Sequence, residues 1–244
     1  MTGLRVWCLS LALLCGPVSA AEALKLVASP WPPFNDHKLL NNGLASDLVG
    51  TALQRAGYAS HYSEVPWARA VKGLRQGRYD VLINAWYSEA RSHFGYFSSP
   101  YLVNRISFLR RKGEAVEFRQ LADLYPYRIA VMRDYAYSPE FDHDRQLTKV
   151  IVSGFQSGAR MVYAGRVDMM VEDEFVARYH LGRTLRGIRD ELEFVPKPLS
   201  ENGLHILVSL GRPDHRRIAE AFNHAIEAMR ADGSYAAILR RHGL

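Results

Sequence analysis

The sequence predicts an α/β fold built as two similar lobes, each a mostly parallel sheet flanked by helices. Short apolar runs alternate with amphipathic segments along the chain, which is typical of parallel strands joined by helices. A Gly-Arg-x-Asp unit between an amphipathic segment and an apolar run occurs twice, at 77–80 and at 165–168. An apolar run that ends in aromatic residues also stands near the start of each half. The repetition of both features in the same order predicts two lobes of one design.

The composition is that of an ordinary globular protein. The chain has 244 residues, 48% hydrophobic and 23% charged, enough for one large or two small domains. These proportions exclude a disordered, collagen-like or disulfide-scaffold chain. The net charge of +6 is spread along the sequence without a run of Lys or Arg. We therefore expect no nucleic-acid partner.

Residues 1–20 have the pattern of a cleaved signal peptide. Arg5 supplies a positive start, residues 6–15 are almost wholly apolar, and a small-x-small pattern ends at Ala20. The apolar stretch is shorter than the roughly 20 residues of a membrane-spanning helix. Both cysteines of the chain lie within it, so the mature protein is expected to have no disulfide, thiolate nucleophile or cysteine-ligated metal. Cleavage after Ala20 predicts a periplasmic location.

The first half predicts two strands and two helices. A strand over 24–28 ends at the proline-rich and aromatic segment 29–34, because prolines cannot continue a central strand. Apolar residues at helical spacing predict a helix over 47–57. A second helix over 66–77 begins near a proline, which is favoured in a first helical turn, and a strand over 81–83 follows.

The second half repeats this order. A strand over 128–132 ends at the aromatic segment 134–137, and Ser138-Pro139 predicts the start of a short helix. A helix that ends near Tyr163 precedes a strand over 169–171.

The chain is expected to cross between the lobes twice, near 107–110 and near 201–208. Lobe 1 then comprises 21–108 and 204–244, and lobe 2 comprises 109–203. Ligands of open α/β sheets bind at the carboxyl ends of the strands. The segments after the predicted strands are rich in aromatic and charged residues, which predicts a cleft lined by 31–34, 84–91, 134–138 and 172–174.

Short motifs along the mature chain point to one family. They are Trp-Pro-Pro-Phe (31–34), Gly-Leu-x-x-Asp-Leu (43–48), Gly-Arg-Tyr-Asp (77–80), Ser-Glu-Ala-Arg (88–91), Phe-Ser-Ser-Pro-Tyr (97–101), Gly-Arg-Val-Asp (165–168) and Ala-Asp-Gly-Ser-Tyr (231–235). In this order they resemble the family 3 extracellular solute-binding proteins of bacterial ABC importers. The resemblance implies the two-lobed type II fold of periplasmic binding proteins and an amino-acid-type ligand.

The resemblance also implies roles for individual residues. Trp31 and Trp67 match the family's two ligand-stacking aromatics. Arg91 matches the arginine that holds a carboxylate by a two-pronged hydrogen bond, a geometry that lysine cannot reproduce. Asp173 matches the second-lobe carboxylate that pairs with an α-ammonium group. Together these four residues would recognise an amino acid zwitterion.

The sequence departs from the family pattern at three places. Ala28 stands where amino-acid binders often have an acidic residue. Tyr135-Ala136 replaces a small hydroxyl pair, and Asp134 replaces the glycine before it. The loop over 84–91 is one residue short, with Trp86 and Tyr87 in place of small polar residues. We therefore expect an unusually aromatic pocket, and a ligand that is an amino acid or a related carboxylate.

The predicted ligand-binding set is Trp31, Trp67, Trp86, Ser88, Arg91, Tyr135 and Asp173. Four of them have a structural alternative. Arg91 could cap local carbonyls or pair with Glu89, and Asp173 could stabilise a helix N-terminus. The two aromatics Trp31 and Trp67 could belong to a lobe core.

The expected function is capture of a small ligand and its delivery to an ABC permease of the inner membrane by a monomer, without a cofactor. The nine histidines have no metal-ligand spacing, so no metal is expected. One alternative is an enzyme similar to cyclohexadienyl dehydratase, with Glu172, Asp173 or Glu174 as its acid or base. Another is a ligand sensor for a membrane receptor. The chain stops at Leu244 without the transmembrane helix of fused receptors, which favours a free shuttle.

Overall fold

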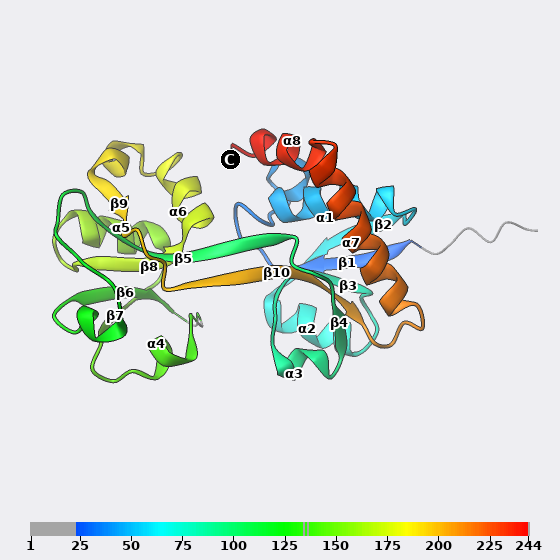
Figure 1. Ribbon diagram of the computed structural model, residues 1–244, viewed down its shortest axis with the longest axis horizontal. Helices are drawn as coiled ribbons and strands as arrows, with labels where there is room; N and C mark the ends of the chain where they lie inside the picture. The colour runs from blue at the N-terminus through cyan, green and yellow to red at the C-terminus, as the bar shows by residue number, and fades with distance from the viewer. Residues whose placement is uncertain (1–22, 134, 136, 244) are drawn as a thin grey trace, which may run out of the picture.

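The computed structural model describes residues 23–133, 135 and 137–243, and the predicted signal peptide lies outside these ranges (Figure 1). The strands are β1 (Leu24–Ala28), β2 (Ser60–Glu64), β3 (Val81–Trp86), β4 (Gly95–Phe97), β5 (Leu102–Arg111), β6 (Arg128–Met132), β7 (Thr148–Val152), β8 (Met169–Asp173), β9 (Leu192–Phe194) and β10 (Ser200–Ser209). The α-helices are α1 (Leu44–Arg55), α2 (Trp67–Arg75), α3 (Glu89–Ser92), α4 (Pro139–His143), α5 (Phe155–Tyr163), α6 (Glu174–Leu181), α7 (His215–Ala231) and α8 (Ser234–Arg241). Short 3-10 helices lie at Leu40–Asn42, Leu121–Leu124 and Arg186–Glu191.

Figure 1 shows two groups of elements, with β5 and β10 running between them. The first lobe contains β1 to β4 with α1 to α3, α7 and α8, and the second contains β6 to β9 with α4 to α6. Within the lobes, β1 pairs in parallel with β2 and β3, and β6 pairs in parallel with β7 and β8. The predicted α/β class with two lobes is confirmed.

The two lobes share one continuous sheet. Its strands lie in the order β2-β1-β3-β10-β5-β8-β6-β7, so the antiparallel pair β10 and β5 joins the halves. This pair is hydrogen-bonded from Ser200 opposite Ile106 to Leu204 opposite Leu102. The two crossings of the chain are therefore side by side.

The repeated Gly-Arg-x-Asp unit has the same structure in both lobes. Its glycine has φ of +69° in each copy, a left-handed conformation that glycine adopts without steric cost. In the first lobe Asp80 accepts a hydrogen bond from the backbone N–H of Lys25 at 2.8 Å. In the second lobe Asp168 accepts one from the backbone N–H of Arg128 at 2.7 Å. Each aspartate thus ties the end of a helix to the start of the neighbouring parallel strand.

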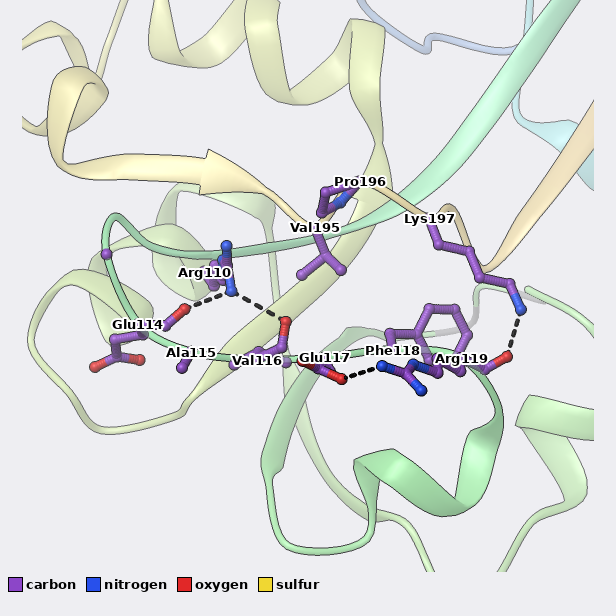
Figure 2. A pocket seen from close by; sticks show the side chains of 11 residues that line it. Arg110, Glu114, Ala115, Val116, Glu117, Phe118, Arg119, Val195, Pro196 and Lys197 are labelled. Carbon is purple, nitrogen blue, oxygen red and sulfur yellow. Dashed lines mark hydrogen bonds and ion pairs between the residues drawn. The ribbon is translucent and has the colours of Figure 1, made fainter.

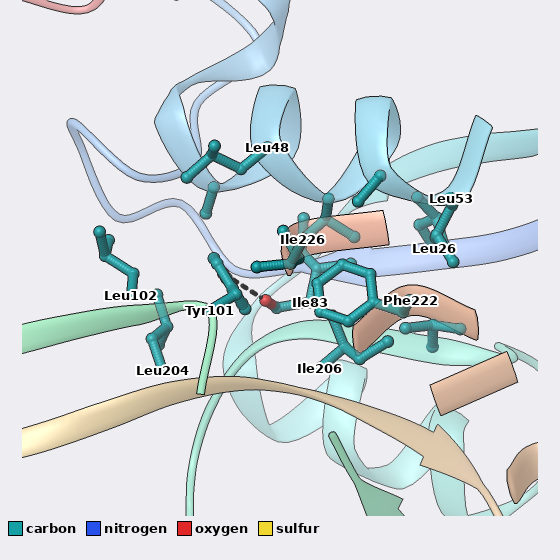
Figure 3. Close-up of a cluster of buried hydrophobic side chains, with 14 of the residues drawn as sticks. Leu26, Leu48, Leu53, Ile83, Tyr101, Leu102, Leu204, Ile206, Phe222 and Ile226 are labelled. Carbon is teal, nitrogen blue, oxygen red and sulfur yellow. Dashed lines mark hydrogen bonds between the residues drawn. The ribbon is translucent and has the colours of Figure 1, made fainter. Parts of the chain in front are cut away.

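Each lobe has its own hydrophobic core. In the first lobe, α1 and α7 cover one face of the sheet, and the fully buried Phe222 and Tyr101 pack edge to face there (Figure 3). The Tyr101 hydroxyl donates to the carbonyl of Ile83 at 2.7 Å, so this ring is also fixed by a buried hydrogen bond. The second lobe packs Phe108 and Phe141 on one sheet face, and α5 and α6 on the other. These cores hold the strand ends that form the site.

Two strands are longer than the sequence predicted. β3 continues to Trp86, which pairs with Leu204, and β8 continues to Asp173, which pairs with Ile106. The expectation that residues from 84 to 86 and from 172 to 173 lie beyond the strand ends was therefore wrong. The crossing strands offer backbone partners at these positions, and hydropathy alone does not show where such partners lie.

None of the helices within the described ranges is long and apolar enough to cross a membrane.

Candidate functional site

The loop after β1 presents Trp31. The backbone N–H of Trp31 donates to the carbonyl of Asn35 at 2.7 Å, and its own carbonyl accepts from Phe34 at 2.8 Å. Phe34 is fully buried with its ring centroid 4.3 Å from that of Trp31. Asn35 donates from its side chain to the hydroxyl of Ser46 at 2.9 Å, which ties the loop to α1. The half-buried indole of Trp31 is therefore held by a folded-back loop anchored in the first lobe.

The first turn of α2 presents Trp67 and Ala68. Pro66 precedes the helix, and its carbonyl accepts hydrogen bonds from Arg69 and Ala70. The N–H groups of Trp67 and Ala68 have no acceptor within the helix, and the helix dipole gives this end a partial positive charge. This end of α2 therefore suits a negatively charged group.

Arg91, on the short helix α3, is the charged residue beside that turn. Its Nη1 donates to the carbonyl of Trp86 at 2.7 Å, and its guanidinium lies over the ring of Trp67, 5.0 Å from the centroid. Burial lowers the pKa of Arg91 from its ordinary value, yet an arginine stays protonated in proteins. No carboxylate among the described residues forms an ion pair with it. The Trp86 carbonyl thus accepts from one of the five N–H donors of Arg91, and the others remain for a ligand.

These groups line one pocket of about 560 Å³ between the lobes. Its lining combines the exits of β1 and β3, the first turn of α2 and one tyrosine of the second lobe, namely Ser29, Pro30, Trp31, Trp67, Ala68, Asn84, Trp86, Arg91 and Tyr135. The structure thus brings together five of the seven predicted residues. Such a volume is within the roughly 300–1,000 Å³ typical of small-molecule sites.

The other two predicted residues lie outside the lining. Ser88 precedes α3 and positions Arg91 through its backbone, because its carbonyl accepts the Arg91 N–H at 3.0 Å. Asp173 is 1% exposed and caps α6, where Oδ1 accepts from the N–H of Val176 at 3.0 Å. The helix-capping alternative for Asp173 therefore describes its contacts in this structure.

A hydrogen-bond chain links Asp173 to the pocket. Oδ2 of Asp173 accepts from Nδ2 of Asn104 at 2.8 Å, and Oδ1 of Asn104 accepts from the indole N–H of Trp86 at 2.9 Å. Asn104 is fully buried on β5, between the lobes. Sequence reasoning missed it. One feature of the sequence could have pointed to it, namely an asparagine within a segment that otherwise favours a strand. A buried amide in a strand requires hydrogen-bond partners.

Glu172 and Asp173 form a buried acidic pair behind this chain. Burial is the main cause that raises the pKa of Glu172 to about 8, and the charge of Asp173 adds to it. Burial also raises the pKa of Asp173 to about 6, although its hydrogen bonds oppose the shift. Oε1 of Glu172 accepts from the backbone N–H of Asp173 at 2.8 Å, and Oε2 has no partner among the described residues. The phenol of Tyr135 also has a raised pKa, first from burial and then from the charge of Glu172.

A second pocket, of about 540 Å³, lies within the second lobe and is shown in Figure 2. Its cations are already engaged. Arg110 donates to the carbonyls of Glu114 and Val116 and forms an ion pair with Glu193, while Lys197 donates to the carbonyl of Arg119. The pocket between the lobes, where Arg91 has no carboxylate partner, is therefore the candidate site.

One group of described residues has metal-type ligands within reach of one another. The side chains of Asp36, His37 and Glu64 place their ligand atoms within 4.8 Å. Glu64 already accepts hydrogen bonds from the hydroxyl of Tyr62 and the backbone N–H of His37. These contacts show that the three residues connect β2 to the loop after β1.

Comparison with known proteins places the chain in a family. The model of the bacterial extracellular solute-binding proteins, family 3, matches residues 25–244. The ABC transporter arginine-binding protein 1 of Escherichia coli (strain K12) is 25% identical over 223 residues, which cover 89% of each chain. A mutant of ArgBP from T. maritima has a TM-score of 0.65 at 21% identity, covering 90% of this chain and 94% of the other. A histidine kinase sensor domain similar to periplasmic binding proteins has a TM-score of 0.68 at 20% identity, covering 90% and 95%. The chain belongs to the bacterial extracellular solute-binding proteins of family 3.

Proposed function

We propose that the protein captures a small carboxylate, an amino acid or a related acid, in the periplasm and delivers it to an ABC importer. The observation that carries this proposal is the position of Arg91. Its guanidinium lines the pocket between the lobes, has no carboxylate partner among the described residues, and adjoins the first turn of α2. A ligand carboxylate would satisfy both positive groups.

Binding proceeds in two steps. The ligand first binds the first lobe, because Tyr135 is the lining residue that comes from the second. The second lobe then closes by a hinge motion about the paired crossing strands, at 102–106 within β5 and 200–204 within β10. Closure excludes water and so strengthens the attraction between the carboxylate and Arg91. The closed monomer is the form that a membrane permease would recognise.

Three facts support transport of an amino-acid-type ligand. The family is one of extracellular solute-binding proteins, and a curated relative is named as an arginine-binding protein of an ABC transporter. The predicted signal peptide at 1–20 supports export. The proposal leaves sensing as the alternative outcome, because a sensor domain shares the fold.

Binding without catalysis fits the contacts of the acidic residues better than the dehydratase-like alternative. Asp173 is engaged by Asn104 and Val176, and Glu172 by the Asp173 backbone. Glu174 accepts from the hydroxyl of Ser107 at 2.8 Å. None of the three belongs to the pocket lining.

The test compares Arg91→Ala and Arg91→Lys with wild type by calorimetry, using the tightest ligand from a thermal-shift screen of amino acids and organic acids. Removing one partner of a buried ion pair costs about 3–5 kcal/mol, so Arg91→Ala should weaken binding by at least about 100-fold. Arg91→Lys should recover only part of this loss. Arg69→Ala removes an exposed arginine of α2 and should change the affinity by less than about twofold. Wild-type affinity in Arg91→Ala would rule out the carboxylate clamp.

A further inference from the structure

The pocket presents flat aromatic surfaces from both lobes. The rings of Trp31 and Trp86 meet edge to face, with centroids 5.8 Å apart and planes at 79°, and so form a corner. Trp67 carries the Arg91 guanidinium over its ring, which leaves that cation beside an aromatic wall. Tyr135 adds a ring from the second lobe. Aromatic rings in offset or edge-to-face contact with such walls gain more than their buried area alone would give.

Asn84 is a buried polar residue of the same pocket wall. It lies on β3, is 5% exposed and lines the pocket. Neither the oxygen nor the nitrogen of its amide hydrogen-bonds to a described residue. Buried polar groups normally have partners, so an uncommitted amide at a pocket wall indicates that the ligand supplies them. The amide is uncharged and offers two donors and one acceptor, which suits a ligand hydroxyl, amide or ring N–H.

The charge of the described lining residues disfavours a cationic ligand group beside Arg91. Arg91 is the charged side chain among the described lining residues. The neighbouring carboxylate of Asp173 is buried, and both of its oxygens accept hydrogen bonds within the protein. A ligand ammonium or guanidinium would therefore lie near the positive charge of Arg91 without a carboxylate partner on the described walls.

From these observations we infer that the site takes a carboxylate that carries a flat ring and an uncharged hydrogen-bonding group. The carboxylate binds Arg91, the ring packs against Trp31 and Trp86, and the uncharged group pairs with Asn84. The inference rests on the proposed function and specifies its ligand class. It also distinguishes this chain from the relative that is named for arginine.

Calorimetry with paired probes tests the inference on the mature protein. The ring probes are L-tyrosine and 4-hydroxybenzoate, their analogues without the hydroxyl are L-phenylalanine and benzoate, and the cationic probes are L-arginine and L-lysine. We expect the better ring probe to bind at least tenfold more tightly than either cationic probe. We also expect the hydroxyl to improve its affinity at least about fivefold over the analogue, the gain from one added hydrogen bond.

Two variants test whether Asn84 causes the preference for ligands with a hydroxyl. Asn84→Leu keeps the approximate volume and should bring the hydroxyl preference close to one. Asn84→Asp adds a carboxylate and should move the preference towards L-arginine and L-lysine. Melting curves show whether each variant folds. If one variant does not fold, the ligand preference of the other variant tests the role of Asn84.

The outcomes separate this inference from the proposed function. Tightest binding of L-arginine or L-lysine by the wild type, lost in Arg91→Ala, would overturn the ligand class and keep the carboxylate clamp. A hydroxyl preference that persists in Asn84→Leu would overturn the role of Asn84. Failure of every probe to bind would overturn the ligand class, whereas the capture of carboxylates is overturned only if no acid of the thermal-shift screen binds.

Discussion

Asn104 holds two residues of different lobes in fixed positions. Its oxygen accepts from Trp86, which belongs to the pocket wall, and its nitrogen donates to Asp173, which caps α6. Because the amide is fully buried, each of these groups would lack a partner without it. Asn104 is thus a positioning residue: it sets the orientation of the Trp86 ring and stabilises the Asp173 carboxylate.

Asn104→Leu should lower the free energy of unfolding by about 1.5–3 kcal/mol, because it leaves a buried carboxylate and a buried indole N–H without a partner. Urea unfolding followed by circular dichroism measures the change. Asn202 pairs with Asn104 across the β5–β10 ladder and is half-buried. Asn202→Leu is therefore the matched control and should stay within about 0.5 kcal/mol of wild type. Equal effects of the two substitutions would show that the hydrogen-bond chain contributes no stability.

Glu172 should make the protein less stable as the pH rises. The pKa of Glu172 in the folded protein is about 8, above its ordinary 4.5, so between these values the folded state holds a proton that the unfolded state has lost. The free energy of unfolding then falls with pH, by up to about 1.4 kcal/mol per unit for this group. Asp173, with its pKa raised to about 6, acts in the same direction at lower pH.

Glu172→Gln removes this titration and keeps an acceptor for the Asp173 N–H. We expect the variant to gain stability over wild type progressively from pH 5 to pH 8, as measured by urea unfolding at each pH. Glu220→Gln is the control, because it removes a carboxylate from an exposed position on α7. A constant difference between Glu172→Gln and wild type across this interval would contradict the buried, protonated state.

The site was predictable from the sequence only in part. Trp31, Trp67 and Arg91 stand in motifs, and Trp86 and Tyr135 follow predicted strands, so each could be named as a candidate. Asn84 lies next to these residues but carries no motif of its own. Asn104 acts through Asp173, a residue 69 positions away, and the register of β5 against β8 sets that contact. The register of two strands that are distant in the chain cannot be predicted from a single sequence.

At the scale of elements, the start of α1 fixes the loop that carries Trp31. Gly43 precedes the helix with φ of +99°, and a Cβ there would lie 2.6 Å from the carbonyl oxygen of Phe34. The N–H groups of the first two α1 residues, Leu44 and Ala45, donate to the carbonyls of Pro33 and Phe34. The close approach between loop and helix therefore requires glycine at this position.

Gly43→Ala should destabilise the protein by about 1–3 kcal/mol or more, from the strained φ and the overlap with the Phe34 backbone. Gly50 lies in the middle of the same helix, and a Cβ there has nothing within 4 Å. Gly50→Ala should therefore stabilise the protein by about 0.5–1 kcal/mol. Thermal unfolding of the two variants gives opposite shifts of Tm if the packing is as described, and shifts of the same sign would contradict it.

Most elements followed from local patterns. The strands over 24–28 and 128–132 have the predicted bounds, because apolar runs between turn signals define them. The Gly-Arg-x-Asp repeat predicted two lobes, and the hydrogen bonds of Asp80 and Asp168 explain the recurrence. The ends of β3 and β8 were missed because pairing with the crossing strands, distant in sequence, sets them.

At the scale of the whole molecule, the lobes already touch beside the crossing strands. Phe175 of α6 packs edge to face against Phe34 of the first lobe at 5.8 Å, and Val176 joins the core of that lobe. The start of α6 thus rests on the first lobe, and Tyr135, which follows the neighbouring parallel strand β6, faces the pocket. We expect closure to pivot near the start of α6.

Ligand binding should make the molecule more compact. We expect the radius of gyration from small-angle X-ray scattering to fall when the tightest ligand of the screen is added to wild type. Arg91→Ala at the same ligand concentration should keep the value of the free protein, because the carboxylate no longer binds. An unchanged radius in ligand-saturated wild type would contradict closure by a hinge.

Because the sheet is continuous, the lobes are connected by a two-stranded ribbon that can twist. Since β5 and β10 are hydrogen-bonded to each other where they cross, the lobes turn about a paired ribbon and not about two independent linkers. A paired ribbon twists more easily than it shears, because shear would break the ladder from Ser200 to Leu204 and twist would not. Backbone amides in this ladder should therefore keep their protection from hydrogen exchange in both the open and the closed molecule.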